Sequence, residues 1–440
     1  MKNDFSPLCI LGAGLTGLST AYHLGDAEYE IFEKESYVGG NCRTEQKDGF
    51  YFDSAGHIFY PKTDYVRQLA GKLLGDNLTE ADREAWIYLY GVFTRYPFQA
   101  NLYGLPVDVV KECLLGLFEA KLREAREGET VPAHFLDFIH RTFGEGMAKH
   151  FMIPFNNKHW RVPLDQLNLD WMGKFVPRPS FAQVLDGSLK QAEKCIGQNA
   201  TFIYPKRGGV QAVCDGFLPH IRPVRLNAEI TGLDLRARTF EVNSRQTVGF
   251  EQAVSTLPLP VLLKATKDLP ADIRAAAAKL RWNSLYVVNV AVDRPSLTEK
   301  HRFYVPEQQY IFHKLAFYSA YAPLMAPSGK TAASAEVGSS RESPVDRATI
   351  EERVIGDLTR MNVLRKDDRI LFTHVMTMPY AYAIYDKDRA PASQAIREFY
   401  ARNRVYCWGR YAEWVYQNME QNIQTGQKVA DMVKRGALGL

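Results

Sequence analysis

A glycine-rich turn between an apolar run and a helical pattern is the feature that most constrains the fold of this 440-residue chain. Residues 7–11 are apolar enough for a buried strand, and residues 18–24 follow with the spacing of a helix. Between them lies Gly12-Ala13-Gly14-Leu15-Thr16-Gly17. In such a turn the first glycine makes the bend, the second lets the backbone approach a pyrophosphate, and the third lets helix and strand pack closely. The order strand, turn, helix therefore predicts a dinucleotide-binding βαβ unit.

An acidic residue completes this pattern. Residues 29–32 have the composition of a second strand, which ends at Glu33. That position follows the glycines by about 20 residues, where a carboxylate accepts hydrogen bonds from a ribose. The predicted cofactor-binding residues of this unit are Gly12, Gly14, Leu15, Thr16, Gly17, Glu33 and Lys34.

Composition excludes several other classes of protein. The 54 basic and 50 acidic residues leave a net charge of +4, which is too small and too dispersed to indicate a nucleic-acid partner. The six cysteines are scattered, so we expect neither a metal site nor a disulfide framework. No apolar run approaches the ~18–20 residues that span a bilayer, and the N-terminus has no signal-peptide pattern. We therefore expect a cytoplasmic protein with reduced thiols and no membrane span.

A second glycine pair follows the acidic residue, in Gly39-Gly40-Asn41-Cys42-Arg43-Thr44. This segment resembles the flavoprotein clan of amine oxidases and protoporphyrinogen oxidase, in which it supports bound FAD. The C-terminal part is similar too: Gly409-Arg410-Tyr411 precedes an expected helix at 419–434, and in that clan this helix points its N-terminus at the flavin. The resemblance implies FAD as the cofactor and adds Gly40, Asn41, His57, Arg410, Glu420 and Gln421 to the residues that bind it.

Short blocks in the middle of the chain narrow the resemblance. They are residues 96–103, 155–163, 169–173 and 199–209. In this order they resemble UDP-galactopyranose mutase, and its eukaryotic branch more than its bacterial one. The resemblance implies interconversion of the pyranose and furanose forms of a nucleotide-diphosphate sugar, for cell-surface polysaccharide synthesis. It implies that N5 of the reduced flavin is the nucleophile, with NADPH or NADH as a reductant.

The resemblance also assigns roles to individual residues. Aromatic rings stack on a base and amides read its edge, whereas phenols donate to phosphate oxygens. The implied substrate-binding residues are Tyr96, Phe98, Gln99, Asn156, Trp160, Arg178, Asn199, Tyr304, Lys314, Tyr382 and Tyr416. The implied catalytic residues are His57, Lys314, Tyr304, Tyr382 and Tyr416.

The chain departs from the mutase pattern at the two arginines that clamp the diphosphate. By spacing, Phe175 and Lys314 occupy these positions, and a local shift would let Arg178 replace the first. An arginine grips phosphate with a planar fork, whereas lysine acts as a point charge. The ending, residues 409–421, also resembles a bacterial group of FAD proteins similar to protoporphyrinogen oxidase.

Two alternatives therefore stay open beside the mutase. One is an FAD-dependent oxidoreductase of the amine oxidase or protoporphyrinogen oxidase type. The other is a non-catalytic flavoprotein. The sequence leaves the sugar, the base and the oligomeric state open.

The predicted fold is α/β, with a Rossmann-like FAD-binding domain, an inserted helical domain and an antiparallel β-sheet substrate domain. Alternating stretches rich in Val, Tyr and Phe predict strands within 282–325 and 368–385, and residues 323–344 have the composition of a loop. The expected FAD-binding domain comprises 1–90, 200–275 and 390–440, the helical domain 105–199, and the substrate domain 91–104 and 276–389.

Overall fold

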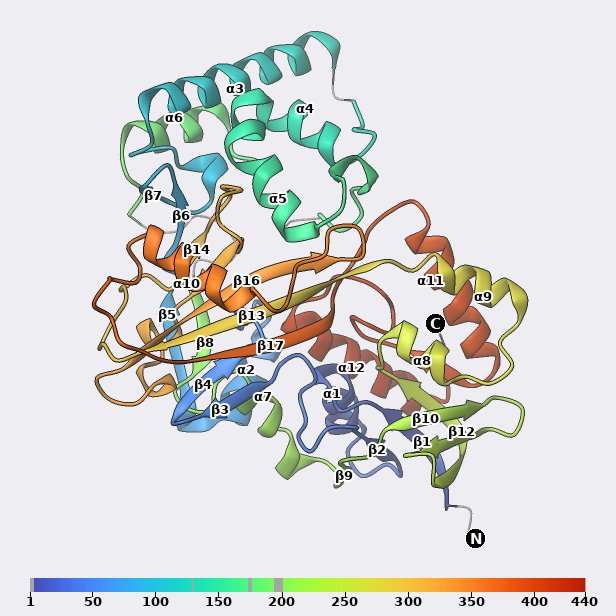
Figure 1. The fold of residues 1–440 in the computed structure, drawn as a ribbon. Coiled ribbons are helices and arrows are strands. Elements are labelled where there is room, and N and C mark those ends of the chain that lie inside the picture. The colour runs from blue at the N-terminus through green and yellow to red at the C-terminus, as the bar shows by residue number, and fades with distance from the viewer. Residues whose placement is uncertain (1–3, 129, 173–175, 194–200, 440) are drawn as a thin grey trace.

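The computed structural model describes residues 4–128, 130–172, 176–193 and 201–439, and its first sheet is built around the glycine turn. The strand order is β10-β11-β12-β1-β2-β9, and β18 also pairs with β12 (Figure 1). The strands are β1 (Asp4–Leu11), β2 (Glu30–Phe32), β9 (Val224–Arg225), β10 (Ile230–Asp234), β11 (Thr239–Val242), β12 (Gln246–Ser255) and β18 (Val405–Cys407). Strand β1 is parallel to both β2 and β12, so the centre of this sheet has the βαβ arrangement that the turn predicted.

Two helices far apart in the sequence cover the glycine turn. Helix α1 (Leu15–Leu24) follows the turn, and α12 (Met419–Lys434) packs along it. The approach is close, because a Cβ on Gly426 would lie 2.5 Å from Cβ of Ser19. The bounds of α12 confirm the helix expected at 419–434.

The second sheet has the order β17-β13-β16-β15-β14-β6-β7. Its strands are β6 (Ala85–Leu89), β7 (Val92–Arg95), β13 (Trp282–Val292), β14 (Arg302–Tyr304), β15 (Lys314–Ala316), β16 (Thr331–Ser340) and β17 (Ile370–Ala383). The pairs are antiparallel except β14 with β6, which are parallel. The sheet is therefore mixed rather than purely antiparallel. Because β6 pairs here, residues 85–89 belong to the second sheet, although we expected residues 1–90 to lie in the FAD-binding domain.

Strand β16 corrects the loop that we expected over residues 323–344. It pairs with β13 along its whole length, and each of its residues is buried. Its Ala, Ser and Gly side chains suggest a loop by composition, but small side chains also fit a strand that is covered on both faces. Packing, rather than propensity, decides this segment.

Helices between residues 107 and 189 form one end of the molecule (Figure 1). They are α3 (Val107–Glu127), α4 (Phe135–Met147), the π-helical turn Ala148–Met152, α5 (Ile153–Trp160) and α6 (Phe181–Leu189). A core of aromatic and aliphatic side chains, including Phe98, Phe138 and Trp160, holds them together. The helical periodicity expected over 107–149 is thus confirmed.

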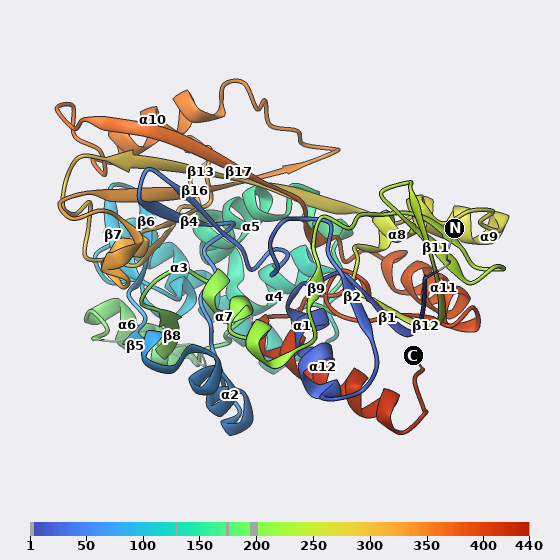
Figure 2. The ribbon, with the colours of Figure 1, turned by 90° about the horizontal axis from the view of Figure 1, so that it is seen from below.

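Smaller elements complete the fold. They are the pairs β3 (Thr44–Lys47) with β4 (Phe50–Asp53) and β5 (Leu78–Asp82) with β8 (Thr201–Pro205), and the helices α2 (Asp64–Leu74), α7 (Gln211–Asp215), α8 (Leu259–Ala265), α9 (Ala271–Ala278), α10 (Ile350–Arg360) and α11 (Arg389–Arg402). Figure 2 shows the long strands β13, β16 and β17 along one side of the molecule, with α12 and α2 on the opposite side. In the described ranges, no helix has the length and apolar character of a membrane span.

Candidate functional site

The three glycines of the turn meet different surroundings. A Cβ on Gly12, where φ is +99°, would lie 2.6 Å from Oγ1 of Thr256, and a Cβ on Gly17 would lie 2.1 Å from the carbonyl oxygen of Gly12. A Cβ on Gly14 would meet no atom within 4 Å. Gly12 and Gly17 are therefore required by the fold itself. Gly14, which caps the N-terminus of α1, instead borders open space.

The backbone around the turn is held by Glu33. Its Oε2 accepts a hydrogen bond from the backbone N of Ala13 at 2.9 Å, and its Oε1 accepts one from the backbone N of Glu35 at 3.1 Å. Burial raises the pKa of Glu33, and these hydrogen bonds oppose the shift. The backbone N of Gly39 donates to the carbonyl oxygen of Ala13, so the second glycine pair lies directly against the first turn. Lys34 points away to an exposed ion pair with Glu35.

The N-terminus of α12 lies beside the same turn. Oγ1 of Thr16 donates to Oδ1 of Asn422 at 2.7 Å, which ties the start of α1 to the start of α12. Two of the predicted cofactor residues hold this helix in place. The Oε1 atom of Glu420 accepts from the backbone N atoms of Lys62 and Thr63, and Gln421 forms the capping box with Asn418.

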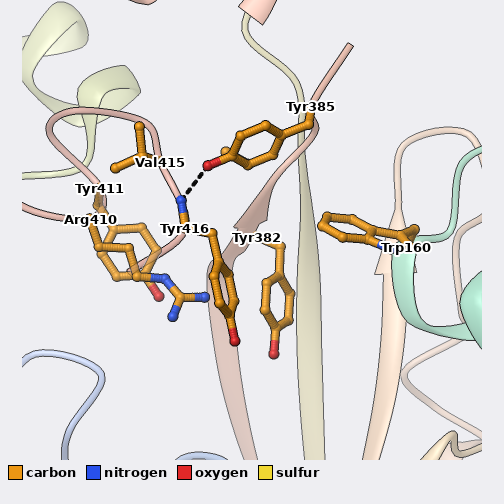
Figure 3. A pocket seen from close by; sticks show the side chains of 8 residues that line it. Trp160, Tyr382, Tyr385, Arg410, Tyr411, Val415 and Tyr416 are labelled. Atoms are coloured by element: carbon orange, nitrogen blue, oxygen red, sulfur yellow. Dashed lines mark hydrogen bonds between the residues drawn. The ribbon is translucent and has the colours of Figure 1, made fainter. Parts of the chain in front are cut away.

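Arg410 connects the turn with a cavity lined by aromatic rings (Figure 3). The guanidinium donates to the carbonyl oxygens of Gln417 and Ala381, and its carbon lies 5.1 Å from the ring of Tyr382 and 4.8 Å from that of Tyr416. The two phenol rings stack, with centroids 6.0 Å apart. The cavity also contains Trp160, Tyr385 and Tyr411 in its walls, and Nδ2 of Asn41 donates to the hydroxyl of Tyr411.

A buried carboxylate holds Lys314 near this cavity. Glu336 of β16 lies 2.5 Å from Nζ of Lys314 and accepts a hydrogen bond from the backbone N of Gly56 at 2.8 Å. The guanidinium of Arg302 donates to the carbonyl oxygen of Gly56. Burial would raise the pKa of Glu336, but Lys314 and Arg302 outweigh it and hold that pKa below its usual range. Lys314 is therefore one half of a buried ion pair.

Tyr304 lies opposite Lys314 in the β14–β15 pairing and gathers cations around its phenol. Its hydroxyl accepts a hydrogen bond from Arg83 at 2.6 Å, and its ring stacks on Tyr96 with centroids 4.8 Å apart. Burial alone would raise the pKa of Tyr304, but Arg83, Arg302 and Lys314 together lower it. The site thus has a strongly cationic side. A phenol there can donate its hydrogen bond to an anion.

Histidine side chains also belong to this cluster of residues. Nδ1 of His159 lies 3.3 Å from Nε2 of His313, and the ring of His159 lies 4.6 Å from that of Tyr382. Burial, followed by the charge of Lys314, lowers the pKa of His159 to about 3. Burial, followed by the charge of Arg410, lowers the pKa of His57 to about 4. Both rings are therefore neutral at pH 7 and cannot add to the positive charge.

Some predicted substrate residues do not join this cluster. Phe98 has no exposed surface and stacks on Phe151 in the helical core, so it offers no face to a base. The amide nitrogen of Asn156 donates to the carbonyl oxygen of Met152, the last residue of the π-helical turn before α5. Arg178 lies over the ring of Phe138 and, with Gln99, lines a second cavity among the helices. Asn199 and Phe175 lie outside the described residues.

Sequence reasoning missed Glu336, His159, His313 and Arg83. Glu336 lies in the segment expected to be a loop, so no strand pairing with Lys314 was predicted for it. His159 lies inside the mutase-like block 155–163, next to Trp160, which was a signal that could have found it. Within the described part of the chain, no group of three or more His, Cys, Asp or Glu residues could hold a metal ion.

Similarities to known proteins identify the family of this chain. Residues 15–434 match the family described as flavin containing amine oxidoreductase. A crystal structure of reduced UDP-galactopyranose mutase is similar with a TM-score of 0.92 and 26% identity, over 98% of this chain and 94% of that one.

Curated relatives match over shorter stretches. Coproporphyrinogen III oxidase of Staphylococcus aureus is 20% identical over 250 residues, which is 53% of either chain. The 15-cis-phytoene desaturase of Glycine max is 33% identical over 98 residues, which is 21% of this chain and 17% of the desaturase. This chain therefore covers about half or less of the length of the curated relatives that it matches.

Proposed function

Because this chain belongs to the family of flavin-containing amine oxidoreductases, we propose that it binds FAD and interconverts the pyranose and furanose forms of a nucleotide-diphosphate sugar. The observation that carries this proposal is the cavity edge where Tyr382 and Tyr416 stack beside Arg410, with Lys314 and Tyr304 close by. Phenols and cations of this kind suit a diphosphate, and the aromatic walls suit a sugar ring. We assign the product to cell-surface polysaccharide synthesis.

The glycine turn supports FAD as the group that is held. The open space at Gly14 is what a pyrophosphate needs in order to reach the backbone, and the N-terminus of α1 directs N–H groups there. Gly12, Leu15, Thr16, Gly17, Glu33, Gly40, Asn41 and Arg410 would form the remaining contacts. When bound in its reduced form, the flavin supplies the nucleophile of the isomerisation.

The side chains of the chain itself would position the substrate. In the proposal, Lys314 and the phenols of Tyr304, Tyr382 and Tyr416 meet the diphosphate, and Tyr96 meets the base. His57 and His159 stay neutral, so they can hydrogen-bond a sugar hydroxyl without attracting a second anion. Since Glu336 neutralises part of the charge of Lys314, Arg83 beside Tyr304 and Arg410 beside Tyr416 would add to the attraction of the diphosphate.

An FAD-dependent oxidoreductase is the second candidate function. The same buried Glu336 favours it, because a lysine that is already paired is a weaker phosphate ligand than an arginine clamp. In that case the aromatic cavity would hold a substrate that reduces the flavin directly.

The deciding experiment incubates the protein, reduced anaerobically with dithionite or NADPH, with UDP-, dTDP- and GDP-linked sugars, and separates the products by chromatography. A furanose isomer formed only by the reduced protein supports the mutase. Bleaching of the oxidised flavin by a substrate alone, without an isomer, contradicts it and favours the oxidoreductase. Bound flavin without any response to ligand would favour a non-catalytic flavoprotein.

A matched pair of lysine variants tests the site assignment. We expect Lys314→Met to raise the Kd for the sugar nucleotide by about tenfold, which corresponds to the loss of ~1.4 kcal/mol, while Lys314→Arg retains binding. Lys264→Met, on the exposed side of α8, is the control. If Lys314→Met binds the nucleotide as tightly as the control, the assignment is wrong.

A further inference from the structure

His159 has an unused ring nitrogen beside the aromatic cavity. Its ring lies 4.6 Å from that of Tyr382 and 5.1 Å from that of Trp160, and both of these side chains line the cavity. Figure 3 shows the ring of Tyr382 between those of Trp160 and Tyr416. His159 is partly exposed, and in the described part of the chain its Nε2 atom has no hydrogen-bond partner. This nitrogen is therefore available to a ligand.

The backbone that carries His159 is held by two strands of the second sheet. Nδ2 of Asn283, in β13, donates to the carbonyl oxygen of His159 at 2.8 Å. Just after α5, Nε of Arg161 donates to the carbonyl oxygen of Gly338, in β16, at 2.7 Å. A side chain on such a fixed element keeps a defined position, which a residue that selects a ligand requires.

The other ring nitrogen of His159 belongs to a chain of buried groups. Its Nδ1 lies 3.3 Å from Nε2 of His313, and this Nε2 lies 3.8 Å from Oε2 of Glu336. His313 and Glu336 are each 1% exposed. The backbone N of His313 also donates to the carbonyl oxygen of Glu336 at 3.1 Å. The buried carboxylate of β16 is thus connected through His313 to His159.

Glu336 determines which ring nitrogen of His313 carries the proton. Burial holds the pKa of His313 well below its usual range, so the ring is neutral at pH 7 and has one N–H. A proton on Nδ1 would be a buried donor without a partner among the described residues, and it would leave the lone pair of Nε2 facing a carboxylate. A proton on Nε2 avoids both costs. His313 is therefore the Nε2–H tautomer.

This tautomer of His313 sets the tautomer of His159. When Nε2–H of His313 donates to Nδ1 of His159, that Nδ1 carries no proton. Because His159 is neutral at pH 7, its single proton then lies on Nε2. The nitrogen beside the cavity is thus a donor without charge. Such a donor suits the oxygen of a hydroxyl group, and it adds nothing to the attraction of a phosphate.

We propose that His159 is a specificity-determining residue, which donates from Nε2–H to a hydroxyl oxygen of the sugar, and that His313 and Glu336 are positioning residues that fix its tautomer. The ligand in this inference rests on the proposed function, whereas the tautomer does not. A sugar that lacks the hydroxyl leaves a desolvated donor without a partner, so it binds less well. The chain would thereby distinguish sugars that carry the same diphosphate.

Nitrogen NMR on the full-length protein, with its histidine rings labelled with ¹⁵N, tests the tautomer without any sugar. The signals of His159 are identified by their loss in His159→Gln, and thermal melting shows that each variant is folded. We expect only Nε2 of His159 to carry a proton near pH 7. His313→Gln retains an N–H donor and should preserve this state, whereas His313→Leu should give a mixture of both tautomers. A proton on Nδ1 of His159 in the wild type, or an unchanged tautomer in His313→Leu, overturns the proposal.

Titration of the reduced protein with UDP-galactose and its 2-, 3-, 4- and 6-deoxy analogues tests the donation. We expect one analogue to bind the wild type at least about tenfold more weakly than UDP-galactose. His159→Phe keeps a ring against Tyr382 and should remove that difference, whereas the control His220→Phe, at an exposed histidine, should retain it.

The outcomes separate this inference from the proposed function. If the wild type forms the furanose isomer but selects among the analogues no better than His159→Phe, the role of His159 is wrong and the mutase stands. If the wild type binds none of these sugar nucleotides, the proposed function is contradicted together with the ligand assigned to His159.

Discussion

The glycine turn and the aromatic cavity, the two proposed binding sites, are built by different means. The turn is made of backbone groups from residues 12–17 and 39–40, which are close in sequence. The cavity is lined by side chains from α5, from the end of β17 and the residues just after it, and from the loop before α12. A backbone site depends on the space that glycine leaves open. A side-chain site depends on the charges that its neighbours place around it, as Glu336 does for Lys314.

The largest effect is expected at the turn. Gly14→Val should give a folded protein without flavin, because the new side chain occupies open space that a pyrophosphate needs. Gly17→Val should instead prevent folding, since its Cβ overlaps the carbonyl oxygen of Gly12. The measurements are flavin absorbance per protein and thermal melting.

Gly71→Ala is the control for these glycine variants, because a Cβ there also meets no atom within 4 Å but the residue lies inside α2. It should retain flavin. A yellow Gly14→Val protein would disprove the cofactor assignment of the turn.

The second effect is a dependence of folding stability on pH that comes from His159, beside the cavity. His159 is neutral in the folded protein with a pKa of about 3, whereas an unfolded histidine titrates near 6.5. The unfolded state then binds more protons between these values, so stability is full above pH 6.5 and falls as the pH decreases toward 3. Each unit of pKa difference is worth about 1.4 kcal/mol, so we expect a loss of a few kcal/mol.

Urea unfolding at several pH values measures this loss. His159→Gln should make the decrease between pH 6.5 and pH 3 shallower, while His220→Gln, at an exposed histidine, should leave it unchanged. An equal slope in the wild type and His159→Gln would show that His159 is not a source of the pH dependence.

The smallest effect is expected from a single phenol of the cavity. Tyr416→Phe keeps the ring that stacks on Tyr382 and removes one hydroxyl, so we expect nucleotide-sugar affinity to fall by several-fold, or about 1 kcal/mol. Isothermal titration with the reduced protein measures this, and flavin content should not change. Tyr400→Phe is the control, because its hydroxyl is buried against Thr266 away from the cavity. Equal affinities in both variants would remove Tyr416 from the substrate site.

Local sequence signals predicted some elements correctly, whereas packing decided others. Strand β1, the glycine turn, α1 and α12 follow from periodicity and glycine spacing, because these signals are local. Strand β16 does not, since its small residues become a strand only when β13 and β15 flank it. Phe98 was expected to face a base, but the packing of Phe151 encloses it in the helical core.

The need for glycine at position 17 follows from the turn's own residues, since a Cβ there would overlap the carbonyl oxygen of Gly12. Tertiary structure alone decided the charge state and partners of the cavity. Lys314 is paired because β16 brings Glu336 beside it, and His159 is neutral because burial excludes the water that would solvate its charged form. Steric limits on the backbone of the turn depend on residues that are close in sequence. Desolvation and the effect of distant charges arise only after distant segments have packed together.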